Sequence, residues 1–185
     1  MNLDDLERIR QIDTLNMLAE IDDLPDQLAR AYQIGLHAVF RKDSWHVKQV
    51  VISGMGGSAI GADLLAAYVA DACPVTVIDH RDYGLPSFAR GEKTLVICSS
   101  HSGDTEETLD SYEAARRHGC HVLAICTGGE LALRTQKDKV PLITFEHAGQ
   151  PRAAVGYSFG ILLAVFVRLG LIPEQADEIH SAVTA

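Results

Sequence analysis

Within the segment Cys98–Thr108, which reads CSSHSGDTEET, three hydroxyl side chains and a glycine fall within one turn. Ser100, Ser102 and Thr105 can each donate a hydrogen bond to a phosphate oxygen, as can the backbone N–H groups around them. Gly103 relieves steric crowding at the bend. A hydrogen bond to a charged group contributes about 1.5–3 kcal/mol. A handful of these donors could therefore hold a phosphate dianion without a lysine.

Helix capping is the alternative interpretation of the same segment. Asp104 would cap the following helix, Glu107 would complete a capping box, and Glu106 would favour the positive end of the helix dipole. Capping accounts for the carboxylates, but it does not account for three hydroxyl residues beside a second glycine-containing strand end. We therefore favour a phosphate-binding loop.

A second candidate loop, GMGGSAIG, occupies Gly54–Gly61. Gly56 and Gly57 allow positive φ and leave room for a ligand against the main chain, and Ser58 adds a hydroxyl donor. The N-terminus of the helix that follows offers unpaired N–H groups and a partial positive charge. The loop is thus a second candidate for ligand binding.

Two other interpretations of the glycine loop stay open. The glycines could simply turn the chain. Alternatively, Gly54, Gly56 and Ala59 match the loose dinucleotide fingerprint, and Asp79 lies at the end of the second strand, about where that fingerprint places an acidic residue. The rival hypothesis is therefore a Rossmann-like nucleotide-binding domain.

Both loops need a scaffold, and the pattern of strands and helices supplies one. Helical segments are expected at 58–70, 105–118 and 153–169. Strand-like apolar runs are expected at five places: 47–54, 75–78, 94–99, 121–126 and 140–145. Alternating strands and helices with nearly continuous apolar strands predict a parallel sheet covered on both faces. We expect an α/β fold: a three-layer αβα sandwich with a doubly wound parallel sheet of about five strands, preceded by N-terminal helices. Ligands bind such sheets at the carboxyl ends of the strands.

The two ends of the chain read as helical. Apolar residues recur at every third position near the N-terminus, and on one continuous helix such a stripe would drift around the helix axis. A break at Asp13-Thr14, which can cap a new helix, avoids this drift. Pro25 opens another helix that runs to about Phe40. The spacing is carried by Leu3, Leu6, Ile9, Ile12, Leu15, Leu18 and Ile21. We divide the chain into a helical segment at 1–46, the αβα domain at 47–170, and 171–185. This last segment starts a C-terminal helix that truncation could cut short, with Pro173 in its first turn.

The composition of the chain argues against some classes of binding partner. A chain of 185 residues with 47% hydrophobic and 22% charged residues fits one globular domain. The formal charge of -9 argues against nucleic acid, which requires clustered lysine and arginine. No signal peptide is visible, and the longest apolar stretch, Phe159–Val167, is too short for a bilayer. We expect a cytoplasmic protein without a membrane partner.

Neither the cysteines nor the histidines suggest a metal or a cofactor. The four cysteines lack C-x-x-C and zinc spacings, so we expect buried hydrophobic side chains, with a redox pair of Cys98 and Cys126 as the alternative. The histidines and carboxylates show no metal-ligand spacing, and no G-x-S-x-G elbow is present.

Four sequence blocks together carry a family resemblance. GMGGSAIGADLL, RDYGLP, SHSGDTEETL and QPRAAVGY occur in this order and fall within residues 24–169. The strand–SxSGxT–helix arrangement resembles the phosphosugar loop of sugar isomerase (SIS) domains. The four blocks resemble the first half of the bifunctional phosphoglucose/phosphomannose isomerase family. The resemblance implies an SIS (flavodoxin-like) fold and an aldose–ketose isomerase acting on sugar phosphates of the glucose, mannose and fructose 6-phosphate type.

The resemblance also implies residue roles. Arg152 would stabilise the enediolate intermediate, although from sequence alone it reads as a surface arginine at a helix start, where the dipole disfavours a cation. The resemblance assigns phosphate binding to the second loop and sugar contacts to the first. The implied substrate-binding residues are Gly56, Gly57, Ser58, Ser100, His101, Ser102, Gly103 and Thr105. His101 departs from the family tyrosine, and Asp104 from the family asparagine.

Family members have their catalytic glutamate and ring-opening histidine in the second half, so the resemblance implies a homodimer that needs a second SIS domain. We expect these 185 residues alone to be inactive. Glu146 and His147 could be nominated within this chain, but a solvated loop is the preferred interpretation of both. The alternative function is a non-catalytic module that senses a sugar phosphate.

Overall fold

The computed structural model describes residues 4–40 and 45–185, and it shows one parallel sheet of five strands. The strand order is β2-β1-β3-β4-β5, so the direction of winding reverses between β1 and β3. The bounds are Gln49–Ser53 for β1, Thr76–His80 for β2, Thr94–Ser100 for β3, His121–Cys126 for β4 and Leu142–Thr144 for β5. The predicted α/β fold with a doubly wound five-stranded sheet is confirmed.

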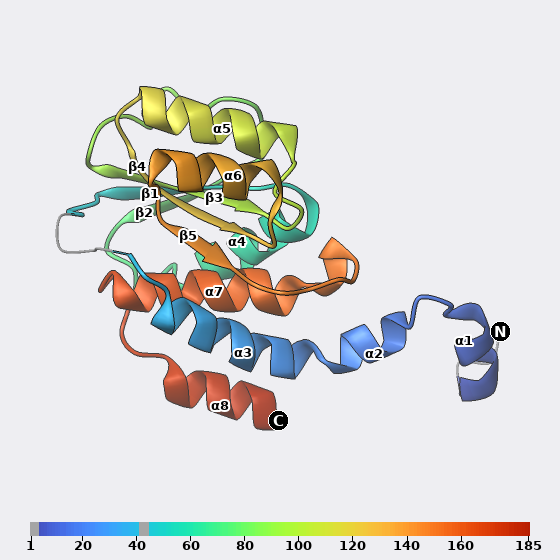
Figure 1. The fold of residues 1–185 in the computed structure, drawn as a ribbon. Helices are drawn as coiled ribbons and strands as arrows, with labels where there is room; N and C mark the ends of the chain where they lie inside the picture. The colour runs from blue at the N-terminus through green and yellow to red at the C-terminus, as the bar shows by residue number, and fades with distance from the viewer. Residues whose placement is uncertain (1–3, 41–44) are drawn as a thin grey trace.

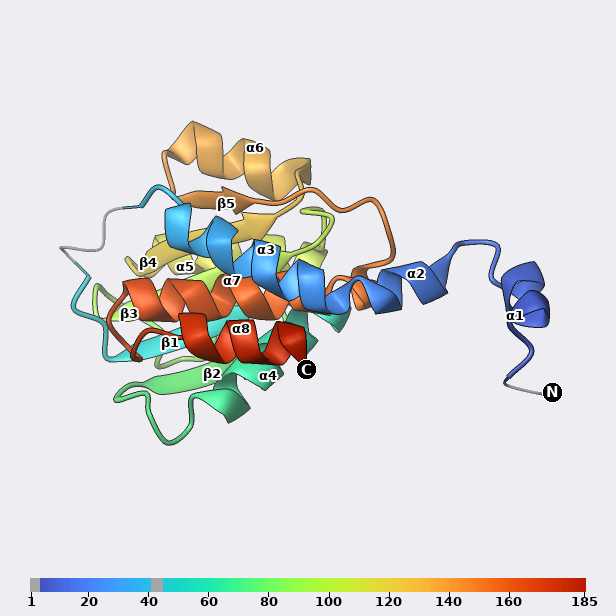
Figure 2. The ribbon, with the colours of Figure 1, turned by 90° about the horizontal axis from the view of Figure 1, so that it is seen from below.

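Helices cover both faces of the sheet and make three layers (Figure 1). On one face lie α5 and α6; on the other lie α4 and α7, with α3 and α8 outside them (Figures 1 and 2). The bounds are Leu24–His37 for α3, Gly56–Tyr68 for α4, Glu106–Arg117 for α5, Gly129–Asp138 for α6, Val155–Arg168 for α7 and Ala176–Thr184 for α8. A single 3-10 turn, Pro151–Ala153, precedes α7.

The strands divide the core into two clusters because alternate side chains point to opposite faces. On β1, Val50 and Ile52 pack toward the α4–α7 face, whereas Val51 packs toward α5 and α6. All three side chains are fully buried. This explains why β1 and β3 read as continuous apolar runs.

Helices α3 and α7 pack closely through glycines. A Cβ at Gly160 would lie 2.8 Å from the Ala31 Cβ, and one at Gly35 would lie 2.6 Å from the Ala164 Cβ. Such contacts let two backbones approach, which fixes the N-terminal helix layer against the sheet. The helical N-terminal segment therefore belongs to the body of the molecule from α3 onward.

The N-terminal break falls where the sequence predicted it. Helix α1 spans Leu6–Ile12 and α2 spans Met17–Asp22, and the Asp13 carboxylate accepts hydrogen bonds from the N–H groups of Met17 and Leu18. These bonds lower the pKa of Asp13. Helix α1 extends away from the layers and buries none of its residues (Figures 1 and 2). Leu3 lies outside the described residues.

Three details differ from the predictions. Helix α6 was not expected, because Gly128 and Gly129 obscure its start. Helix α8 begins at Ala176, so Pro173 lies before the helix instead of in its first turn, although Ile179 is buried as its spacing suggested. Helix α3 begins at Leu24 and ends at His37, short of Phe40. No helix within the described ranges has the length and apolar character needed to cross a bilayer.

Candidate functional site

The glycine loop (Gly54–Gly61) and the loop that carries the three hydroxyls (Ser100–Thr105, the hydroxyl loop) meet at the carboxyl edge of the sheet, where the winding reverses. Strands β1 and β3 are neighbours, so the segments after Ser53 and Ser100 emerge side by side. A hydrogen bond links the loops directly, since the His101 N–H donates to the Ser58 Oγ at 3.1 Å. The position is the one at which doubly wound sheets bind ligands.

The glycine loop is shaped by close backbone packing. A Cβ at Gly57 would overlap the Pro151 carbonyl oxygen and would lie 3.1 Å from the Arg152 nitrogen. Gly56 has a φ of +53° and open space around its α-carbon. The first residues of α4 are therefore held against the turn that carries Arg152, and Gly56 leaves the approach from solvent free.

Hydrogen bonds to its own hydroxyl groups stabilise the hydroxyl loop. Ser100 is 2% exposed; its Oγ accepts from the Gly103 N–H at 3.0 Å and lies 2.9 Å from the Thr105 Oγ1. The Ser102 side chain is exposed, and its Oγ accepts from the Asp104 N–H at 3.2 Å. The three predicted hydroxyls thus lie in one compact turn, with Ser102 the most open to a ligand.

The same loop presents N–H donors. Within the described part of the chain, the N–H groups of Ser102 and Thr105 make no hydrogen bond. Thr105 is also the N-cap residue of α5, and no side chain caps this helix. The positive end of the α5 dipole and these unpaired donors point to an anion.

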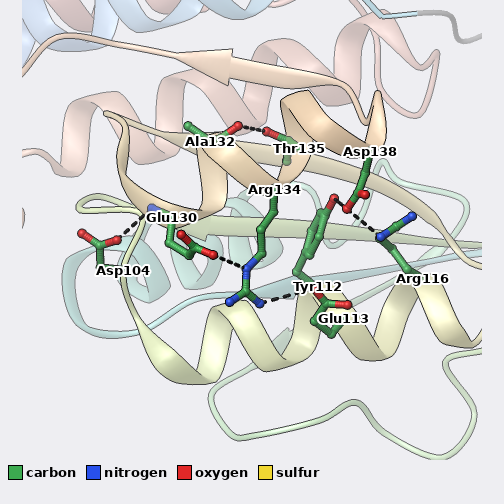
Figure 3. Close-up of polar contacts among 9 residues, drawn as sticks. All are labelled: Asp104, Tyr112, Glu113, Arg116, Glu130, Ala132, Arg134, Thr135 and Asp138. Carbon is green, nitrogen blue, oxygen red and sulfur yellow. Dashed lines mark hydrogen bonds and ion pairs between the residues drawn. The ribbon is translucent and has the colours of Figure 1, made fainter.

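The capping alternative for Asp104 is wrong. Its Oδ1 accepts from the Glu130 N–H at 2.8 Å, at the start of α6, instead of from the first turn of α5 (Figure 3). No capping box forms with Glu107, because α5 has no side-chain cap. Asp104 therefore joins the hydroxyl loop to the neighbouring helix.

Helix α6 clamps the hydroxyl loop from outside. Gly103 has a φ of +78°, and a Cβ there would overlap the Gly128 carbonyl oxygen. The Gly103 carbonyl accepts from the Leu131 N–H at 2.9 Å. Further along, Arg134 bonds to Glu130 and Glu113, tying α6 to α5 (Figure 3).

The far ends of α5 and α6 are joined as well. Asp138 accepts from the Tyr112 hydroxyl at 2.9 Å and from the Arg116 guanidinium at 2.6 Å (Figure 3). Burial is the main cause that raises the pKa of Tyr112, so the phenol stays protonated and donates. The helix that follows the hydroxyl loop is thus joined to α6 near both of its ends.

His101 reaches a partner far along the chain. Its Nε2 lies 2.9 Å from the His147 Nδ1, and its ring stands edge-on to Phe145 with centroids 5.8 Å apart. His147 in turn lies edge-on to Tyr157. Glu146 is exposed, as a solvated loop predicts, but His147 is half-buried and bonded to the candidate loop. The solvated-loop interpretation therefore fits only the first of these two residues.

Arg152 lies at the margin of the site. Its backbone touches Gly57, but its exposed side chain lines a hollow of about 550 Å³ between α1, α2 and the 3-10 turn. Within the described residues, Arg152 has no carboxylate partner, unlike Arg30, which pairs with Asp23. Arg152 does not line the small cavity between the two loops, although its neighbour Pro151 does.

The structure gives the remaining candidates different surroundings. Asp79 bonds to the Arg81 guanidinium at 2.5 Å, and burial is the main cause that raises its pKa. All four cysteines are free thiols; Cys98 and Cys126 are buried, and burial raises the pKa of both. Across residues 4–40 and 45–185, no three metal-binding side chains gather.

Known proteins match the chain along nearly all of its length. It is 46% identical over 167 residues to a bifunctional phosphoglucose/phosphomannose isomerase of Caldicellulosiruptor bescii, an alignment that covers 90% of this chain and 49% of that protein. The chain is a homologue of the bifunctional phosphoglucose/phosphomannose isomerases. It spans about half the length of the C. bescii relative. No family model matches it.

Solved structures show that this isomerase homologue has the SIS fold. The C-terminal domain of glucosamine-fructose-6-phosphate aminotransferase from Francisella tularensis superposes with a TM-score of 0.63 at 16% identity, covering 91% of this chain and 51% of that one. Tagatose-6-phosphate ketose/aldose isomerase from Escherichia coli gives 0.58 at 16% identity, covering 91% and 52%. At these identities the likeness concerns the fold alone.

In this isomerase homologue, sequence reasoning missed the residues that hold the two loops in place. The Thr127 N–H and hydroxyl both donate to the His101 carbonyl, at 3.0 and 2.8 Å, and Gly128 packs on Gly103. The Ser158 hydroxyl lies 3.4 Å from the Gly57 carbonyl. A signal for the first contact was present, since TGG follows strand β4 in the way that glycines follow β1 and β3.

Proposed function

We propose that this chain binds a phosphorylated sugar at the hydroxyl loop, as one SIS half of an aldose–ketose isomerase. The observation that carries the proposal is the turn of Ser100, Ser102 and Thr105 at the uncapped start of α5, beside the glycine loop. The phosphate would accept from the Ser102 hydroxyl and from the free N–H groups of Ser102 and Thr105. Homology to phosphoglucose/phosphomannose isomerases supports this class of ligand.

The sugar would extend from the phosphate toward the glycine loop. Gly56 leaves the main chain accessible there, Gly57 packs against Pro151, and Ser58 is fixed against His101. Isomerisation develops negative charge on the sugar oxygens, and a cation stabilises that charge. We assign this role to Arg152, whose backbone borders Gly57 and whose guanidinium is unpaired among the described residues.

The full reaction belongs to the larger assembly in this proposal. The site described here supplies phosphate binding, sugar contacts and an arginine, whereas a base must still move a proton between neighbouring carbons. We assign that base to a second SIS domain and expect a homodimer. The relatives that share this chain's sequence are about twice its length, which supports the assignment.

Calorimetry with glucose 6-phosphate, mannose 6-phosphate and unphosphorylated glucose tests the proposal. Both phosphates should bind and glucose should not, because most of the donors face the phosphate. Arg152→Gln should retain phosphate binding, since Arg152 is assigned to the sugar oxygens. Equal binding of glucose and glucose 6-phosphate would show that the hydroxyl loop is not a phosphate site.

A further inference from the structure

The His101–His147 contact brings two imidazoles together at the hydroxyl loop. His101 follows β3 and His147 follows β5, so the pair bridges the sheet edge across the end of β4. Their rings are nearly perpendicular, at 87°, with centroids 5.1 Å apart. Both side chains are half-buried, and His101 also lines the small cavity between the two loops together with Ser58 and Pro151. The pair thus borders the proposed ligand site.

The histidine pair has two relevant protonation states, one neutral and one with an added proton. A 2.9 Å contact between His101 Nε2 and His147 Nδ1 needs one bridging proton, which either nitrogen can carry. When the pair is neutral, one of the two outer nitrogens carries a proton and the other is a bare acceptor. Addition of a proton makes both outer nitrogens donors and gives the pair a charge of about one unit. Neither outer nitrogen has a partner within the described residues.

The surroundings disfavour a positive charge on His101. Burial is the main cause, and His147 the second, that lowers the pKa of His101. The titratable group packed on the other side is Tyr157 of α7, whose hydroxyl accepts from Arg30 of α3, itself paired with Asp23. Ser58 on α4 and Phe145 after β5 carry no charge.

Among the described residues, no carboxylate bonds to the pair. The Glu20 carboxylate of α2 lies against Gly149, two residues after His147. Asp104 bonds to the start of α6, and Glu146 is exposed to solvent. Neither Lys nor Arg occurs in the hydroxyl loop from Ser100 to Thr105. A phosphate dianion bound there would therefore find positive charge only outside the loop, from the imidazole pair after β3 and β5 or from the exposed guanidinium of Arg152.

We propose that the His101–His147 pair takes up one proton when a phosphate dianion binds the hydroxyl loop, and so supplies the counter-charge that this loop lacks. The inference rests on the proposed function. The proton comes from bulk solvent and adds to the bare outer nitrogen; no covalent bond to the ligand forms. The dianion favours the charged pair, because a nearby opposite charge stabilises an imidazolium.

The sign of the pH dependence follows from this linkage. The pKa of His101 is lowered in the free protein and rises when the dianion is bound. Between those two values, binding is accompanied by proton uptake, so affinity falls as pH rises, at most about tenfold per pH unit for one proton. The phosphate has its own pKa of about 6, and binding as a dianion would release that proton, which is the opposite sign.

Calorimetry of the wild-type chain with glucose 6-phosphate, at about pH 7 in two buffers of different ionisation enthalpy, counts the protons. We expect net uptake of a substantial fraction of one proton. His147→Gln and His101→Tyr keep polar or aromatic groups in place but remove the pair, so uptake should vanish and affinity at about pH 7 should fall several-fold. His180→Gln, which changes an exposed histidine on α8, is the matched control and should leave uptake unchanged.

The outcomes separate the two proposals. Binding of glucose 6-phosphate without proton uptake by the wild-type chain would overturn the His-pair inference and leave phosphosugar binding intact. Uptake that persists in both folded variants would also overturn it. Absence of any binding between about pH 6 and 8 would overturn both proposals. The wild-type measurement decides the matter even if a variant fails to fold.

Discussion

The two loops at the switch point differ in how they are built. After β1, the glycine loop is fixed by steric contact: Gly57 lies directly against the Pro151 carbonyl. After β3, the loop is fixed by polar contacts: Ser100 bonds to Gly103 and Thr105, while α6 holds the outside. Steric packing thus fixes the first loop. In the second loop, hydroxyl groups both fix the conformation and offer hydrogen-bond donors to a ligand. Substitutions in the second loop should therefore differ in effect: some should lower both stability and ligand affinity, and others should lower affinity alone.

Gly103→Ala should have the largest effect. Residue 103 has a φ of +78°, and an added Cβ would overlap the Gly128 carbonyl oxygen of a fixed neighbouring turn. We expect stability to fall by about 3 kcal/mol, roughly 6–12 °C in melting temperature for a chain of this size, with loss of sugar-phosphate binding. Gly119→Ala is the control, because its φ is +71° with open space around it, and it should cost only about 1–2 kcal/mol. Equal losses in thermal unfolding would mean that α6 does not clamp the loop.

Ser100→Ala should weaken both stability and binding. The change leaves the Gly103 N–H without its acceptor and the Thr105 hydroxyl without its partner, in a position that is 2% exposed. An unsatisfied buried group costs about 1–3 kcal/mol. Urea unfolding and calorimetry on the same preparation should show both losses. Unchanged stability would indicate that the loop does not depend on this serine.

Ser102→Ala should affect binding alone. The exposed hydroxyl is proposed to donate to the phosphate, so its loss should cost about 1.5–3 kcal/mol, more than tenfold in affinity. Stability should stay within about 0.5 kcal/mol, since the Asp104 N–H can bond to water instead. Ser181→Ala, an exposed serine on α8, is the matched control and should change neither. Identical affinities for the two variants would make the hydroxyl loop a structural feature.

Asp104→Asn should have the smallest effect and should tighten binding. It removes a negative charge near the phosphate, whose repulsion is about 1 kcal/mol at an exposed site and falls with added salt. An asparagine oxygen can still accept from the Glu130 N–H, so α6 should stay attached. Calorimetry at low and high salt should show the gain shrinking as salt rises. A gain that is independent of salt would contradict an electrostatic origin.

The fold was largely predictable because its signals are local. The apolar runs identified all five strands to within a few residues, and Asp13 marked the break between α1 and α2. Helix α6 was missed because its start carries Gly128 and Gly129, with a φ of +71° at Gly129, so the usual start signals are absent. The capping assignment of Asp104 failed because its partner is contributed by that unrecognised helix.

The geometry of the candidate site was predictable only in part. The residues that form the hydroxyl turn are close in sequence, so their types and spacing sufficed. The His101–His147 contact joins residues 46 positions apart, and it depends on β3 and β5 flanking β4 in the sheet. No local pattern encodes that order. Likewise, Arg152 was expected at the reaction centre, but the position of its side chain depends on how the N-terminal helices pack against the 3-10 turn.

Two titrations of the wild-type chain in a calorimeter at low salt, one with glucose 6-phosphate and one with NAD, distinguish a phosphosugar site from a nucleotide site. The hydroxyl loop is proposed to bind a phosphate on a sugar, and Asp79, which the dinucleotide fingerprint would use, already bonds to Arg81. We predict saturable binding of glucose 6-phosphate, lost in Ser102→Ala, and no signal above background with NAD. Micromolar binding of NAD without binding of glucose 6-phosphate would contradict the account and favour a nucleotide site.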